Sequence, residues 1–133
     1  ASYPSATDAL AAVSGDAFFV CPARRMARAA GANAFRYSFE RPLDNPFFTG
    51  LGVFHSSEIP FVFGNDNYPL GSIASGAALA GTMQSEWTDF AKTGTPGADW
   101  PAYAAADPYM QLTDTPSAQM GLKSALCDFW DGL

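Results

Sequence analysis

The clearest strand signal in the chain lies at residues 34–39, where apolar and polar side chains alternate strictly. Phe35, Tyr37 and Phe39 fall on one face of an extended chain, and Arg36 falls on the other. A strand exposes unpaired backbone groups along its edges, so this one needs neighbouring strands. Because helical patterns flank it on both sides, the sequence predicts an α/β fold.

Helical signals occupy most of the remaining chain. The sequence predicts helices over residues 5–14, 16–30, about 75–92 and about 117–131. Gly15 and Gly31 are expected to end the first two helices. Residues 109–113 alternate more briefly and are expected to form an edge strand. The prediction is therefore one or two strands of a sheet with several helices, and this order places a long loop directly after the first strand.

Composition narrows the possible partners. The chain has 133 residues, which suits one domain or part of a larger one. It is 48% hydrophobic but only 15% charged, which suggests that further protein covers part of its surface. The net charge of −6 argues against nucleic acid or an anionic membrane as a partner. No apolar run is long enough to span a bilayer.

The long loop carries His55, the only histidine in the chain. Glycines at 50 and 52 allow the backbone to bend just before it. A titratable imidazole on a bent loop among apolar residues suits a general base. It also suits a structural histidine that is hydrogen-bonded to the backbone. Glu58 lies among apolar residues, where a carboxylate needs hydrogen-bond partners, so it is expected to anchor the loop.

Other parts of a catalytic site are missing from the sequence. No serine has glycine on both sides at the spacing GxSxG, and no HGG-type oxyanion segment is present. The chain also lacks nucleotide-binding glycine motifs, and one histidine with two distant cysteines cannot build a zinc site. We therefore expect no cofactor and no metal. Cys21 and Cys127 fit either two buried thiols or one long-range disulfide.

A histidine without its nucleophile suits the end of an α/β-hydrolase, because the histidine comes last in the triad order of that fold. Six stretches of the chain carry a more specific pattern: residues 19–22, 35–39, 52–64, 87–96, 100–103 and 127–130. In their order and spacing they resemble the type B carboxylesterase and cholinesterase-like family. The resemblance implies that residues 1–133 are the C-terminal segment of a single α/β-hydrolase domain, incomplete without its upstream part.

The resemblance also implies roles for individual residues. His55 falls on the catalytic histidine and Glu58 on a buried glutamate that supports it. Substrate-pocket positions are implied for Phe47, Leu51 and Ser57. The cholinesterases carry an aromatic residue at the position of Ser57, and this difference argues against a choline-type substrate.

The same resemblance pairs Cys21 with Cys127 as a disulfide, which suits a secreted or periplasmic protein. The expected partners are an upstream chain or fragment that carries the GxSxG serine, and a small-molecule ester. No nucleic acid and no membrane span are expected. Two alternatives stay open: a non-catalytic binding or adhesion module of the same family, and an independent small α/β domain of unrelated function.

Overall fold

The computed structural model describes residues 3–66 and 73–132, as a small mixed assembly of helices and strands. In chain order the elements are α1 (Ala6–Gly15), the π-helical segment η1 (Asp16–Val20), α2 (Cys21–Ala30), η2 (Gly31–Asn33), β1 (Tyr37–Phe39), η3 (Thr49–Leu51), α3 (Ile59–Phe63), η4 (Ala74–Gly76), α4 (Ala77–Thr93), β2 (Pro108–Leu112), β3 (Ser117–Met120) and α5 (Ser124–Asp131). The glycine, asparagine and proline residues at 64–71 predict a turn-rich linker, which lies partly outside the described residues. The predicted α/β class is confirmed.

The three described strands form one sheet in the order β1-β2-β3. β1 pairs in parallel with β2, with Tyr37 opposite Met110, and β2 pairs antiparallel with β3, with Tyr109 opposite Gln119. The strand predicted at residues 109–113 is confirmed as β2, but its predicted position at the edge was wrong, because β3 pairs with the other side of β2.

The predicted helix over residues 117–131 was wrong in its first half. Residues 117–120 pair with β2, and the helix begins only at Ser124. Between them the chain turns through left-handed backbone angles at Gly121 (φ 74°) and Lys123 (φ 52°). The apolar spacing suits a helix, but the backbone partners that β2 offers outweigh this local preference. A helix over 117–131 would bury most of its apolar residues, Met120, Leu122, Leu126, Phe129 and Trp130, but Met120, Leu126 and Phe129 are exposed.

Gly15 does not end the first helix as predicted. Its backbone angles are helical (φ −59°, ψ −44°), and the chain continues through η1 into α2 without leaving the helical region. The helix ends instead at Gly31, where φ is +59°. η1 is a π-helical turn, a rare form that often occurs at functional sites.

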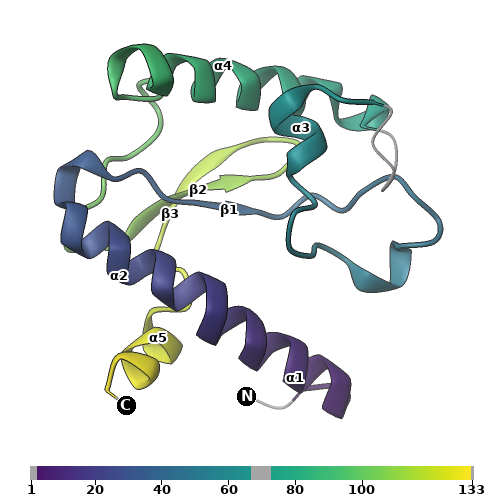
Figure 1. Cartoon of the computed structure of the whole chain (residues 1–133), viewed down its shortest axis with the longest axis vertical. Helices are drawn as coiled ribbons and strands as arrows, with labels where there is room; N and C mark the ends of the chain where they lie inside the picture. Colours follow the sequence, from purple (N-terminus) through teal and green to yellow (C-terminus); the bar gives the residue numbers. More distant parts are fainter. Residues whose placement is uncertain (1–2, 67–72, 133) are drawn as a thin grey trace.

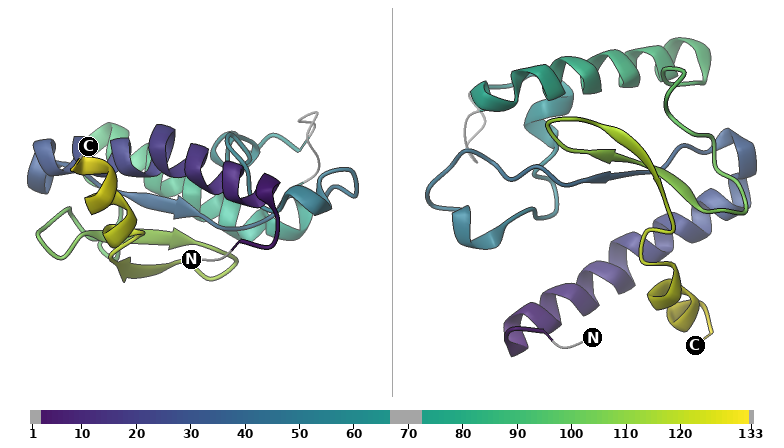
Figure 2. Two further views of the ribbon diagram at one scale, coloured as in Figure 1. Left: turned by 90° about the horizontal axis from the view of Figure 1, so that it is seen from below. Right: turned by 180° about the vertical axis from the view of Figure 1, so that it is seen from behind.

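Helices cover both faces of the sheet. Figure 1 shows α4 along one side of the strands, and α1 and α2 along the other, with α5 beside α2. The main core lies between the sheet, α3 and α4; its buried members are Leu43, Phe61, Ile73, Leu79, Ala80, Met83, Trp100, Met110 and Leu112. The views in Figure 2 show α5 beyond the β2–β3 hairpin, close to the long α1–α2 helix.

The disulfide between Cys21 and Cys127 joins α2 to α5, which confirms the predicted pairing. Both cysteines are fully buried. Arg24 reinforces the same junction, because its Nη1 donates to Asp128 Oδ1 at 2.7 Å. None of the helices in the described ranges is long and apolar enough to cross a membrane.

Asp107 anchors a buried charge network beside this junction. Arg36 donates to its Oδ1, Arg24 forms an ion pair with its Oδ2 at 3.0 Å, and Ser124 donates to Oδ2 at 2.8 Å. Burial alone would raise the pKa of Asp107. The Ser124 hydrogen bond and the positive charge of Arg36 outweigh burial and hold the pKa below its ordinary value.

Replacing Asp107 by asparagine should lower the free energy of unfolding by about 3 kcal/mol at neutral pH, because it leaves buried arginines without their anion. The folded-state pKa is lowered, so this stabilisation is complete above the unfolded pKa of about 3.9 and is lost as pH falls through the folded value. Urea unfolding at pH 7 and pH 3 checks this, with the exposed substitution Asp99→Asn as control. An equal difference at both pH values would contradict it.

Candidate functional site

His55 is delivered by a long loop, residues 40–58, which connects β1 to α3. Its one regular element is the short 3-10 turn η3, and a connection this long with so little regular structure is uncommon and often functional. The loop turns sharply at Gly52, where φ is +61°, a region that favours glycine. His55 therefore lies on the loop that leaves the end of a strand, which is where α/β folds place their chemistry.

A tight turn presents the His55 side chain outward. The Ser57 N–H donates to the Phe54 carbonyl oxygen at 3.0 Å, and the Ile59 N–H donates to the Ser56 carbonyl oxygen at 3.2 Å. Ser56 has φ 73°, so the backbone passes through the left-handed region directly after His55. The His55 imidazole is therefore exposed, and hydrogen bonds fix the backbone that follows it.

The imidazole stacks on the ring of Phe19. Their centroids lie 4.3 Å apart and their planes differ by 22°. Phe19 comes from the π-helical segment η1, and the wider turn of that segment sets where its ring points. Sequence reasoning missed this contact, because no residue pattern marks a π-helical turn within a helical stretch.

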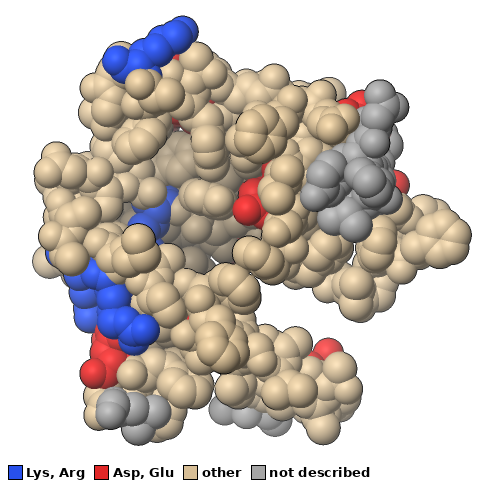
Figure 3. All heavy atoms as spheres, in the orientation of Figure 1, with Lys and Arg blue, Asp and Glu red and all other residues tan. Residues whose placement is uncertain are grey.

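A hollow of about 660 Å³ adjoins His55. It lies between the helix that runs through η1 and α2 and the loop turn, with β1 as its floor; its lining includes Phe19, Tyr37, His55, Ser57 and Glu58. Figure 3 shows that this face is hollowed between α4 and the α1–α2 helix, and that most of it carries no charge. Basic side chains gather along the α2 edge instead.

The structure brings Ser57 and Glu58 together with His55, but it does not bring Phe47 or Leu51 there. Ser57 is fully buried, and its hydroxyl has no hydrogen-bond partner among the described residues. Glu58 is half-buried. Phe47 is 92% exposed and Leu51 61% exposed, and neither belongs to the described lining of the hollow.

Electrostatics in the hollow involve Tyr37 and Glu58. Burial raises the pKa of the Tyr37 hydroxyl, and the negative charge of Glu58 raises it further. The phenol is therefore neutral at physiological pH and can act only as a hydrogen-bonding group. Within residues 3–66 and 73–132, no carboxylate lies in ion-pair contact with the His55 imidazole, whose ring contact is Phe19.

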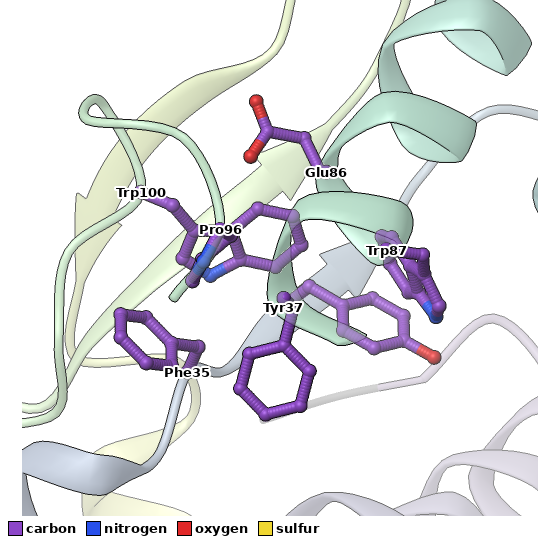
Figure 4. Close-up of a pocket in the computed structure, with 7 residues that line it drawn as sticks. Phe35, Tyr37, Glu86, Trp87, Pro96 and Trp100 are labelled. Carbon is purple, nitrogen blue, oxygen red and sulfur yellow. The ribbon is translucent and has the colours of Figure 1, made fainter. Parts of the chain in front are cut away.

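A second, smaller pocket of about 150 Å³ lies under α4 and does not include His55. Figure 4 shows aromatic rings of Phe35, Tyr37, Trp87 and Trp100 around it, from the segment before β1, from β1, from α4 and from the loop after α4. Trp87 and Trp100 meet edge to face with centroids 5.4 Å apart. Glu86 accepts a hydrogen bond from the Gly97 N–H, so its carboxylate is used to hold the loop.

No group of three or more metal-binding side chains occurs in the part of the chain that the structure describes. The polar groups that line the hollow are the His55 imidazole, the Glu58 carboxylate, the Tyr37 phenol, the Arg36 guanidinium and three serine hydroxyls, of which that of Ser57 is buried. Of these the exposed imidazole suits proton transfer near neutral pH. It lacks a nucleophile and an orienting acid from the described residues.

Comparison with known proteins gives a consistent result. A family model described as the carboxylesterase family matches residues 1–130. The chain is 36% identical over 142 residues to carboxylesterase 5A of Homo sapiens, covering 92% of this chain and 24% of that protein. It is 34% identical over 134 residues to carboxylesterase 5A of Canis lupus familiaris, covering 87% of this chain and 23% of that protein.

The chain is also similar to acetylcholinesterase of Bungarus fasciatus, with 32% identity over 139 residues. That match covers 93% of this chain and 23% of that protein. The chain thus spans between 23% and 24% of the length of the curated relatives it matches.

Proposed function

Because the chain belongs to the carboxylesterase family, we propose that residues 1–133 form the C-terminal segment of one α/β-hydrolase domain and supply the catalytic histidine of a serine ester hydrolase. The position of His55 carries this proposal. Its imidazole is exposed on a fixed turn after β1, at the mouth of a hollow, with one face against Phe19.

In this mechanism the neutral imidazole of His55 accepts the proton of a serine hydroxyl as that oxygen attacks the ester carbonyl. The imidazolium then returns the proton to the alkoxide that leaves, which departs as an alcohol. A water molecule repeats the two steps on the acyl enzyme. Phe19 restricts rotation of the ring, and a Glu or Asp outside this chain orients it and stabilises its charge.

The serine, the acid and the oxyanion hole would come from an upstream part. One edge of β1 supports this, because no strand among the described residues pairs with it. The Arg36 carbonyl oxygen accepts from the Met110 N–H, and the Glu40 N–H donates to the Leu112 carbonyl oxygen, both at 2.9 Å. Backbone groups alternate in direction along a strand, so those of Tyr37 and Phe39 face away from β2. We infer that a strand of the upstream part pairs with them, because unpaired edges invite association.

The upstream part would also cover apolar side chains that the chain leaves exposed. The exposed set on the helices that flank the hollow includes Leu10, Val13, Phe18 and Met26. Exposed apolar surface of this extent marks an interaction face. Phe47 and Leu51 would become substrate-pocket residues only when the upstream part closes over the loop that carries them.

We infer a small-molecule ester as the substrate. The relatives support this, because two of them carry the name carboxylesterase. The Cys21–Cys127 disulfide favours an oxidising compartment, so a secreted or periplasmic location is proposed.

A phosphonate probe that reacts with catalytic serines tests the proposal. The complete protein should take up one label, on a serine within a GxSxG sequence, and should hydrolyse a para-nitrophenyl ester. Residues 1–133 produced alone should take up none, hydrolyse nothing, and form aggregated or molten material. Heat-denatured complete protein is the control for non-specific labelling.

Two results would contradict the proposal. Ester hydrolysis by residues 1–133 alone would place the whole site on this segment. An unlabelled and inactive complete protein that is folded would instead favour a non-catalytic binding module.

A further inference from the structure

A set of polar groups surrounds the guanidinium of Arg41, a residue that is only 8% exposed. Its Nε donates to Asp114 Oδ1 at 3.0 Å, and its Nη1 donates to the Pro42 carbonyl oxygen at 2.5 Å. Nη1 and Nη2 reach the Asp44 carboxylate at 3.1 to 3.3 Å, and Nη2 also donates to Ser75 Oγ. Each of the three guanidinium nitrogens of Arg41 thus donates at least one hydrogen bond.

The guanidinium is also held between a ring and the backbone. Its Cζ lies 5.6 Å from the centroid of the Phe61 ring. A Cβ added at Gly76 would lie 2.8 Å from Arg41 Nε and 2.6 Å from Phe61 Cε1, closer than real contacts allow. Position 76 therefore suits only glycine, and the close packing fixes Arg41 against Phe61.

These contacts join the two sides of the segment that carries His55. Asp44 precedes His55 by eleven positions and Phe61 follows it by six. Phe61 is fully buried in the main core. Asp114 follows β2, so the same guanidinium also ties the loop to the sheet. Arg41 thus contacts the chain both before the His55 turn, at Asp44, and after it, at Phe61.

We propose that Arg41 is a positioning residue for His55, whose guanidinium fixes both ends of the loop and so sets where the imidazole points. This inference rests on the proposed function of His55. The Ser75 hydrogen bond and the Arg41 charge hold the pKa of Asp44 below its ordinary value against the opposing effect of burial. Asp44 is therefore an anionic partner of Arg41 across the neutral range.

The test compares Arg41→Gln, Arg41→Lys and the control Arg25→Gln in the complete enzyme. Arg25 is exposed on α2 and pairs with Asp131, so the control removes a guanidinium away from the loop. Arg41→Gln should lower kcat for a para-nitrophenyl ester by about 10²-fold, with little change in KM, because small misplacement of a catalytic group is costly. Arg41→Lys should also lose activity, since an ammonium cannot reproduce the planar fork.

Hydrogen exchange gives a readout that does not depend on activity. In Arg41→Gln the amides of Ser57 and Ile59, which close the turn, should exchange faster than in wild type and in Arg25→Gln. Exchange in α2 and α5 should stay unchanged.

Unchanged exchange at the turn would overturn the inference. A uniform acceleration over the whole chain, or failure of both Arg41 variants to fold, would also overturn it, because either result shows a general stabilising role. If exchange rises at the turn but neither Arg41→Gln nor His55→Gln affects activity, the proposed function fails while the loop contact stands. If only His55→Gln abolishes activity, the positioning role alone fails.

Discussion

Replacing His55 by glutamine in the complete enzyme should lower kcat by roughly 10⁴- to 10⁶-fold, the loss seen when triad members are removed. An amide can replace an imidazole as a hydrogen-bonding group, but it cannot accept and return a proton. The fold should survive, because the side chain is exposed and packs mainly on Phe19. Steady-state hydrolysis of a para-nitrophenyl ester measures the loss, and the melting temperature checks the fold.

Rates of the wild-type enzyme and of the glutamine variant under the same conditions decide between a catalytic and a structural role for His55. Near wild-type hydrolysis by the glutamine variant would make His55 a structural residue and remove the only candidate catalytic base from this segment.

Removing the disulfide with Cys21→Ala and Cys127→Ala together should lower the free energy of unfolding by about 4–5 kcal/mol. The bridge spans 106 positions, and a long closed loop restricts the unfolded chain strongly. Both cysteines are replaced so that no free thiol can pair elsewhere. Arg24 still joins α2 to α5 through Asp128, so local contact at the junction should persist.

Denaturant unfolding of the double variant and of oxidised wild type measures this difference. Wild type treated with a reductant is the matched control and should match the variant. A difference of less than about 1 kcal/mol would show that the unfolded chain stays compact without the bridge, so that the closed loop adds little.

The sequence predicted elements well where local pattern and tertiary packing agree. The strict alternation around Tyr37 gave β1, and the apolar spacing around Leu79 and Met83 gave α4. It failed at residues 117–120, where helical spacing competes with strand pairing. The edge of β2 that pairs with residues 117–120 forms only in the folded chain. Local sequence therefore could not show that strand pairing would be preferred over a helix there.

The candidate site was predicted in part for a similar reason. His55 and Glu58 could be found because they lie in one short stretch of sequence. Phe19 is 36 positions before His55, and its contact depends on a π-helical turn that has no sequence signature. Arg41 could not be found either, since its partners Asp114 and Ser75 reach it only through the fold.

The parallel pairing of β1 with β2 sets a time order for folding. Tyr37 lies opposite Met110, 73 positions later, so β1 is synthesised well before the strand it pairs with. At 5–20 residues per second that interval is roughly 4 to 15 s. During it β1 cannot pair with β2, and the bond to Cys127 cannot yet form. The β1–β2 pair and the disulfide can therefore form only after residues 110 and 127 have been made.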